Sequence, residues 1–255
     1  MKTSPRRPQQ ALTLIEVLII ICSLVVLAAL LLPALAPRHH PARQVYCVSN
    51  LKEIGLGWLI WVHDHESRDL PFRVPVAKGG TFGAADPLKN EAWWQYPIIS
   101  NELASPKVLV CPSDKNVGLS RLVADNWSST DPRGGFATVG FRNRSTSYIV
   151  GLDASQPRAG NEWEPSDRIL GGDRNIQFDG HNGNCSSGVG EAQIIRAKGP
   201  TGQNASTARW TNAIHGERGN VLSLDGGVQQ TTSKEFNALS DLNNDAGVGH
   251  FLVPN

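Results

Sequence analysis

The chain has 255 residues and a formal net charge of +1, from 24 basic and 23 acidic side chains. This balance excludes a broad electrostatic attraction to nucleic acid, so no nucleic-acid partner is expected. The length allows one large domain with an added N-terminal segment. The 25 glycines and 16 prolines indicate a loop-rich domain and not a helical bundle.

The N-terminal segment is first basic and then strongly apolar. Residues 1–11 carry three basic side chains, and Glu16 is the single charge between residues 12 and 36. A helix over 12–36 would be about 37 Å long, which exceeds the roughly 30 Å hydrocarbon core of a bilayer. The pattern predicts a transmembrane helix with a cytoplasmic N-terminus, because the basic residues precede it.

Three interpretations of this segment stay open from the residues alone. It could be a plain signal anchor, or a cleaved secretory signal, since Ala34-Leu35-Ala36 is similar to the small-residue cleavage site of such signals. The third interpretation gives Glu16 a purpose. A carboxylate in an apolar helix is costly, so it is expected to have a partner.

Several regular elements are expected in the rest of the chain. Apolar residues at helical spacing predict a stalk helix within 37–66, and the remainder, 67–255, is expected to form a β-rich extracytoplasmic domain. Thr232 and Glu235 form a capping-box pattern that predicts a last helix to about Leu242. Short strands are expected at 107–111, 146–152, 168–176, 192–197, 211–214, 220–224 and 228–231.

The start of the chain resembles the prepilin family, which comprises type IV pilins and the pseudopilins of type II secretion. The chain reads Ala11-Leu12-Thr13-Leu14-Ile15-Glu16, where the family carries a small residue, usually Gly, and then an aromatic residue or Leu, followed by Thr-Leu-Ile/Val-Glu. The resemblance implies cleavage after Ala11 by a prepilin peptidase and methylation of the new Leu12 amine. It also implies that this amine pairs with Glu16 of a neighbouring subunit.

The C-terminal part resembles a prepilin-associated domain that carries a His-x9-Asp-Gly box, here over residues 215–226. The resemblance implies an α+β, pilin-like fold, in which a long N-terminal transmembrane and stalk helix packs on a mainly antiparallel, loop-rich β domain. Further stretches resemble the same group: 50–55, 111–114 and 171–175.

The residues of the box allow more than one role. His215 could serve as an acid–base group or as a metal ligand. The expected role is structural, because no nucleophile or second ligand lies at a characteristic spacing beside it. Asp225-Gly226 suits the positive-φ positions of a tight turn.

The cysteines and one acidic segment are the remaining candidates. Cys47, Cys111 and Cys185 cannot all pair within one chain, and the family resemblance implies a disulfide between Cys47 and Cys111. The side chains of Asp241, Asn243 and Asp245 alternate as in calcium loops, so the segment is either a Ca²⁺ site or a solvated turn. No other cofactor is expected.

These features predict a structural pseudopilin-like subunit of a type II secretion or type IV pilus-like filament. Its expected partners are the membrane, prepilin peptidase, other pilin-like subunits and the assembly machinery. Its expected location is the cytoplasmic membrane, crossed once, with the C-terminal domain periplasmic. No enzymatic activity is expected, because hydrolase motifs such as Gly-x-Ser-x-Gly are missing. The alternative is a membrane-anchored extracytoplasmic binding protein, for example for carbohydrate, that uses exposed tryptophans.

Overall fold

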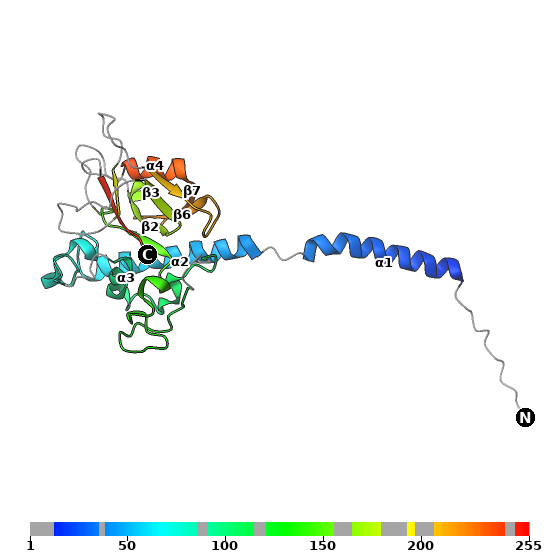
Figure 1. Ribbon diagram of the computed structural model, residues 1–255, viewed down its shortest axis with the longest axis horizontal. Helices are drawn as coiled ribbons and strands as arrows, with labels where there is room; N and C mark the ends of the chain where they lie inside the picture. The colour runs from blue at the N-terminus through cyan, green and yellow to red at the C-terminus, as the bar shows by residue number, and fades with distance from the viewer. Residues whose placement is uncertain are drawn as a thin grey trace, which may run out of the picture. The chain divides into compact units, whose positions relative to one another are not determined.

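The protein is described from a computed structural model over residues 13–35, 39–85, 91–114, 121–155, 165–179, 193–196, 207–242 and 248–254. The chain divides into two compact units, Met1–His39 and His40–Asn255. The first unit contains the helix α1 (Leu14–Leu35), and the second contains the β-sheets and the helices that cover them (Figure 1).

A capping box starts α1. The backbone N–H and the hydroxyl of Thr13 both donate to Glu16 Oε2 at 2.8 Å, and the backbone N–H of Glu16 donates to Thr13 Oγ1 at 3.4 Å. This arrangement satisfies donors that a helix N-terminus otherwise leaves unpaired. The described helix spans Leu14–Leu35.

The predicted transmembrane helix over 12–36 is wrong. Within the described residues, no helix is both long and apolar enough to cross a membrane. The N-terminal helix is shorter than predicted, with 22 residues, and Glu16 places a charge in its first turn. This finding also contradicts the predicted location, a single pass through the cytoplasmic membrane with a periplasmic C-terminal domain. Where one long helix was expected, the structure describes α1 and α2 (His39–Asp64), and residues 36–38 lie outside the described residues.

The α+β character and the antiparallel sheet of the expected fold are present in the second unit. The main sheet has six strands in the order β4-β8-β1-β2-β6-β7, and every pairing in it is antiparallel. A second ladder pairs β3 with β5. The bounds are β1 (Tyr148–Gly151), β2 (Ile169–Asp173), β3 (Ile176–Asp179), β4 (Gln193–Arg196), β5 (Thr207–Trp210), β6 (Arg218–Ser223), β7 (Val228–Thr232) and β8 (Val248–Leu252).

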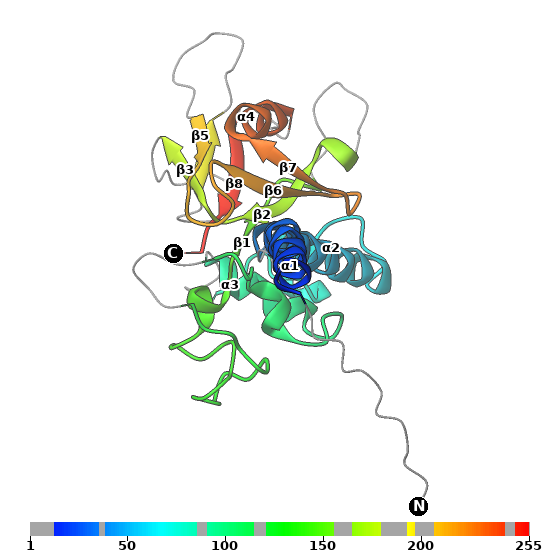
Figure 2. The same cartoon turned by 90° about the vertical axis from the view of Figure 1, so that its right-hand side faces the viewer.

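The main sheet lies between α2 and α4 (Ser233–Leu242), as Figures 1 and 2 show. Successive side chains of a strand point to opposite faces, so Tyr148 and Val150 join one core while Ile149 joins the other. The core with Ile149 also contains Phe236 of α4. Both faces of the sheet are therefore buried.

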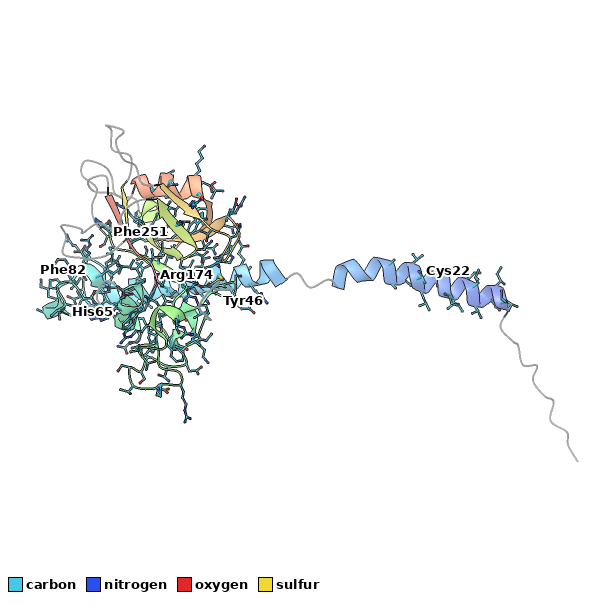
Figure 3. All side chains as sticks on the ribbon, viewed as in Figure 1. Cys22, Tyr46, His65, Phe82, Arg174 and Phe251 are labelled. Atoms are coloured by element: carbon cyan, nitrogen blue, oxygen red, sulfur yellow. A yellow bond between two sulfur atoms is a disulfide. The ribbon has the colours of Figure 1, made fainter. Side chains whose placement is uncertain are left out.

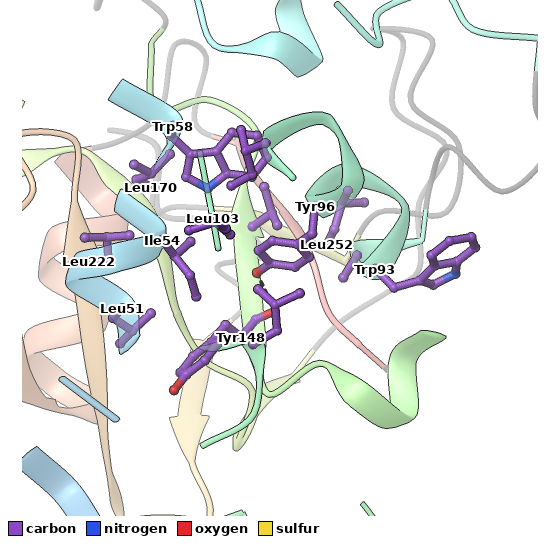
Figure 4. Close-up of a cluster of buried hydrophobic side chains, with 14 of the residues drawn as sticks. Leu51, Ile54, Trp58, Trp93, Tyr96, Leu103, Tyr148, Leu170, Leu222 and Leu252 are labelled. Carbon is purple, nitrogen blue, oxygen red and sulfur yellow. Dashed lines mark hydrogen bonds between the residues drawn. The ribbon is translucent and has the colours of Figure 1, made fainter. Parts of the chain in front are cut away.

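One face of α2 forms the larger core. Leu51, Ile54 and Trp58 are at most 2% exposed and belong to the same cluster as Leu222 of β6, and Figure 4 shows these side chains together. Tyr46, on the same helix, is 63% exposed. The helical spacing seen in the sequence thus marks the face of α2 that packs against the sheet.

Short helical segments connect these elements. Two expected strands are not strands: 107–111 falls mostly in a 3₁₀-helix, and 211–214 lies beyond β5. Pro106 begins that 3₁₀-helix, and Ser105 Oγ caps it by accepting from Lys107 N at 3.3 Å. The bounds are α3 (Ala92–Gln95), η1 (Pro71–Arg73), η2 (Val76–Lys78), η4 (Tyr96–Ile99), η5 (Pro106–Leu109), η6 (Arg142–Ser145) and η7 (Pro165–Asp167).

Candidate functional site: a buried polar cluster at a disulfide

A disulfide joins α2 to the segment that follows η5. Cys47 and Cys111 are bonded, their Cα atoms are 5.0 Å apart, and 64 positions separate them in the sequence. Both are at most 1% exposed. This is the pairing that the family resemblance implied. Cys22 on α1 is a free, exposed cysteine (Figure 3), and Cys185 lies outside the described residues.

His215 lies beside this disulfide, in the turn between β5 and β6. Its Nε2 is 3.5 Å from Cys111 Sγ and 3.5 Å from Asp173 Oδ2, and its side chain is 4% exposed. Desolvation by burial lowers the pKa of His215, and the charge of Asp114 opposes this only in part. The imidazole is therefore held in its neutral form, packed against sulfur and a carboxyl group.

Asp173, at the end of β2, is the buried carboxyl group beside His215. Its Oδ2 accepts from the backbone N–H of Asn220 at 2.7 Å and from Asn220 Nδ2 at 2.9 Å. Its Oδ1 is buried and has no hydrogen-bond partner among the described residues. Burial raises the pKa of Asp173 to about 7, although the hydrogen bonds from Asn220 act in the opposite direction. Both members of the His215–Asp173 pair thus favour their neutral forms.

A second buried carboxylate, Asp114, is fully paired with cations. Its Oδ2 is 2.9 Å from Arg121 Nε and accepts from Arg174 Nε at 2.7 Å, while its Oδ1 accepts from Arg174 Nη2 at 2.9 Å. Ser147 Oγ also donates to Oδ2, at 2.7 Å. Arg174 is labelled in Figure 3. Two arginines and a hydroxyl around one carboxylate form a structural ionic cluster.

The motif segments singled out in the sequence meet at this place. Asp114 from the segment 111–114 pairs with Arg174 from the segment 171–175, and Asp173 from the same segment faces His215. The stalk segment 50–55 contacts the chain just before the segment 111–114, because Asn50 Nδ2 donates to the backbone oxygen of Val110 at 3.1 Å. Segments far apart in the chain therefore build one buried polar cluster around the disulfide.

The two ends of the His-x9-Asp-Gly box have different environments. Asp225 is exposed in the turn between β6 and β7, where its Oδ1 accepts from the backbone N–H of Gly227 at 2.8 Å. Gly226 has a φ of 83°, the left-handed conformation that glycine tolerates best. Asp225-Gly226 therefore builds a turn, while His215 belongs to the buried cluster.

Three donor atoms of the cluster could approach one metal ion. Cys47 Sγ, Cys111 Sγ and His215 Nε2 all lie within 4.8 Å of one another. The residue types match ligands that zinc and other thiophilic metals prefer. Sequence spacing gave no sign of this set, because its members come from α2, from the segment after η5 and from the turn before β6.

A surface pocket of about 700 Å³ borders the cluster on the side of His215. The pocket lies over the end of β5, the start of β6 and the first turn of α4. Its charged lining residues are Arg209, Glu217, Arg218 and Lys234. Among the described residues of the cluster, His215 is the one that lines this pocket.

The other predicted site residues lie elsewhere. Ala11 and Leu12 fall outside the described residues, and Glu16 is engaged in the capping box of α1. Of the predicted calcium ligands, Asp241 falls in the last turn of α4, whereas Asn243 and Asp245 are outside the described residues.

The tryptophans do not form an exposed platform in the described residues. Trp58, Trp61, Trp93 and Trp210 are at most 5% exposed. Two further tryptophans, Trp94 and Trp127, pack against the larger core. These side chains stabilise the fold by burial. The described residues therefore offer no tryptophan-lined binding surface.

Comparison with known proteins gives no relative for this chain: no family model, no curated protein and no solved structure matches it.

Proposed function

We propose that the chain is a pilin-like structural subunit that assembles with other copies through α1. The observation that carries this proposal is the apolar surface of that helix. Its large apolar side chains from Leu14 to Leu27 are between 42% and 84% exposed, and they lie all around the helix. Helices that are apolar on every side are stable only when neighbours cover them on every side.

A filament core of several parallel copies supplies that cover. A single partner helix would bury only one stripe of α1, whereas a helical array surrounds it. The second unit, His40–Asn255, has its own cores and a disulfide. It can therefore remain folded while the α1 helices associate.

Glu16 has a role in this assembly that is compatible with its capping box. An ionised carboxylate has about four lone-pair sites, and the described contacts use Oε2 for two hydrogen bonds from Thr13. The carboxylate can thus also accept the methylated amine of Leu12 from a neighbouring copy. Burial among apolar helices strengthens such a charge-assisted hydrogen bond.

Processing by a prepilin peptidase is the experiment that tests the proposal. Co-expression of the full chain with such a peptidase is expected to remove the first eleven residues and to leave a methylated amine on Leu12, because the segment Ala11–Glu16 follows the family signature. Intact-mass spectrometry measures both changes. A mature chain that begins at Pro37 would contradict the proposal, since cleavage there belongs to a secretory signal.

A further inference from the structure

We propose that, when its disulfide is reduced, the protein binds one Zn²⁺ ion through Cys47, Cys111, His215 and Asp173. The proposal concerns the second unit and is independent of filament assembly. It gives the buried cluster two covalent states, a disulfide and a zinc complex. Each state ties α2 to the segment after η5, and the zinc complex would also tie both to the strands of the main sheet.

The distances at His215 already match a tetrahedral zinc site. Zn–S bonds of about 2.3 Å and Zn–N bonds of about 2.0–2.1 Å place a sulfur and a nitrogen ligand roughly 3.6 Å apart. In the structure, Cys111 Sγ and His215 Nε2 are 3.5 Å apart. All three donor atoms, including Cys47 Sγ, lie within 4.8 Å of one another. The movements required are separation of the two sulfurs after their bond is broken and approach of Asp173, which is not one of the three residues whose donor atoms lie within 4.8 Å of one another.

Asp173 supplies the fourth ligand. The carboxyl group lies beside the proposed nitrogen ligand, because His215 Nε2 is 3.5 Å from Asp173 Oδ2. The two hydrogen bonds from Asn220 orient this carboxyl group, as outer contacts do around metal ligands. Its buried Oδ1 has no partner among the described residues, so Oδ1 is the oxygen that would bind the ion while Oδ2 keeps its hydrogen bonds from Asn220.

The change of state needs a reductant, which is a dithiol in this proposal. The dithiol transfers two electrons and two protons: the Cys47–Cys111 bond breaks, two thiols form, and the dithiol becomes a disulfide. Zn²⁺ then displaces the two thiol protons and binds the two thiolates together with the unprotonated Nε2 of His215. His215 is also one of the residues that line the surface pocket.

The test uses the full chain with Cys22→Ser and Cys185→Ser, so that the pair Cys47 and Cys111 supplies the remaining thiols. The protein is reduced with tris(2-carboxyethyl)phosphine and titrated with Co²⁺, which reports tetrahedral thiolate ligation by its visible and charge-transfer absorption. We expect one Co²⁺ per reduced chain, displaced by Zn²⁺, and none per oxidised chain. Native mass spectrometry measures the same stoichiometry with Zn²⁺.

Substitutions of single residues show which side chains bind the metal ion. His215→Ala and Cys111→Ser are expected to lose the tetrahedral spectrum, and Asp173→Asn is expected to weaken zinc binding by about 10-fold or more. His65→Ala is the matched control, because that imidazole stacks on Trp61 instead, and it should bind as the parent does. Circular dichroism checks that each variant is folded. The proposal is overturned if the reduced parent takes up no Co²⁺, or if His215→Ala gives the parent spectrum.

Discussion

Asp173 and His215 form a pair of buried titratable side chains whose neutral forms are favoured by desolvation. Burial raises the pKa of Asp173 to about 7 and lowers the pKa of His215. The folded protein thus holds the Asp173 proton at pH values where the unfolded chain, with a pKa near 3.9, has released it. Between about pH 4 and pH 7, this carboxyl group makes the folded state less stable as the pH rises.

Replacing Asp173 by Asn should remove this dependence. Asparagine stays neutral and keeps an oxygen for the backbone N–H of Asn220. We compare the oxidised proteins. The free energy of unfolding of Asp173→Asn, minus that of wild type, is expected to rise by about 1 kcal/mol per pH unit between pH 4 and pH 7. His215 contributes in the opposite direction, because its lowered pKa costs stability as the pH falls, but it is present in both proteins.

Urea unfolding at several pH values measures the difference between the two free energies of unfolding. Asp225→Asn is the matched control, because this aspartate is exposed. A constant difference between wild type and Asp173→Asn over this pH range would show that Asp173 is not held neutral by burial.

At the scale of single residues, the local role of a side chain was easier to predict from the sequence than the residue that it contacts. The turn predicted at Asp225-Gly226 agrees with the geometry, and His215 lies in the buried cluster, where its predicted structural role stays a prediction. The local partner of Glu16 was missed, although Thr13 and Glu16 have the same spacing as Thr232 and Glu235, where the capping box was recognised. Because Glu16 lies in an apolar run, the sequence favoured a partner from another subunit. Asp173 was missed because its neighbour His215 is 42 positions away.

The disulfide links α2 to the segment after η5, and the effect of this link on stability can be measured directly. It closes a loop with a sequence separation of 64, and the chain-entropy model gives about 4 kcal/mol for a loop of this length. The double variant Cys47→Ala/Cys111→Ala is expected to lose up to about that free energy of unfolding, measured by urea unfolding. Cys22→Ala is the control, because its thiol is free, and it should unfold as wild type does. Equal stability of all three proteins would contradict a stabilising role for the crosslink.

Elements with strong local signals were predictable, and elements that depend on their neighbours were not. The capping box at Thr232 and Glu235 marks the start of α4, and the helix ends at Leu242 as expected. The apolar run at 107–111 was expected to be a strand, but Pro106 and the Ser105 cap favour a 3₁₀-helix there. No strand was predicted for β8, which is ordered by pairing with β1 and β4 from much earlier in the chain.

At the scale of the whole molecule, the second unit has the features of an independently folded domain. Its two cores and its disulfide all lie within His40–Asn255. The order of strands in the sheet could not be predicted, because β8 pairs with β1 and β4, and β2 pairs with β6, which are not consecutive strands in the chain. The predicted membrane-spanning helix is wrong, because α1 has 22 residues and no described helix is both long and apolar enough to cross a membrane.

In assembly through α1, Glu16 acts both as a helix cap and as a charge between copies. Two variants separate its capping role from its charge. Glu16→Gln keeps a side chain that completes a capping box but removes the charge, whereas Thr13→Ala removes the capping hydroxyl and keeps the charge. The unit His40–Asn255 alone lacks α1 and should not assemble.

The decisive measurement is the amount of chemically cross-linked oligomer that each processed chain forms. We expect a ladder of oligomers from wild type and from Thr13→Ala. We expect the ladder of Glu16→Gln to be weaker by about 10-fold or more, a factor that corresponds to roughly 1.4 kcal/mol per contact. A Glu16→Gln ladder as strong as that of wild type, or oligomers of His40–Asn255 as abundant as those of the full chain, would contradict assembly through α1 and its carboxylate.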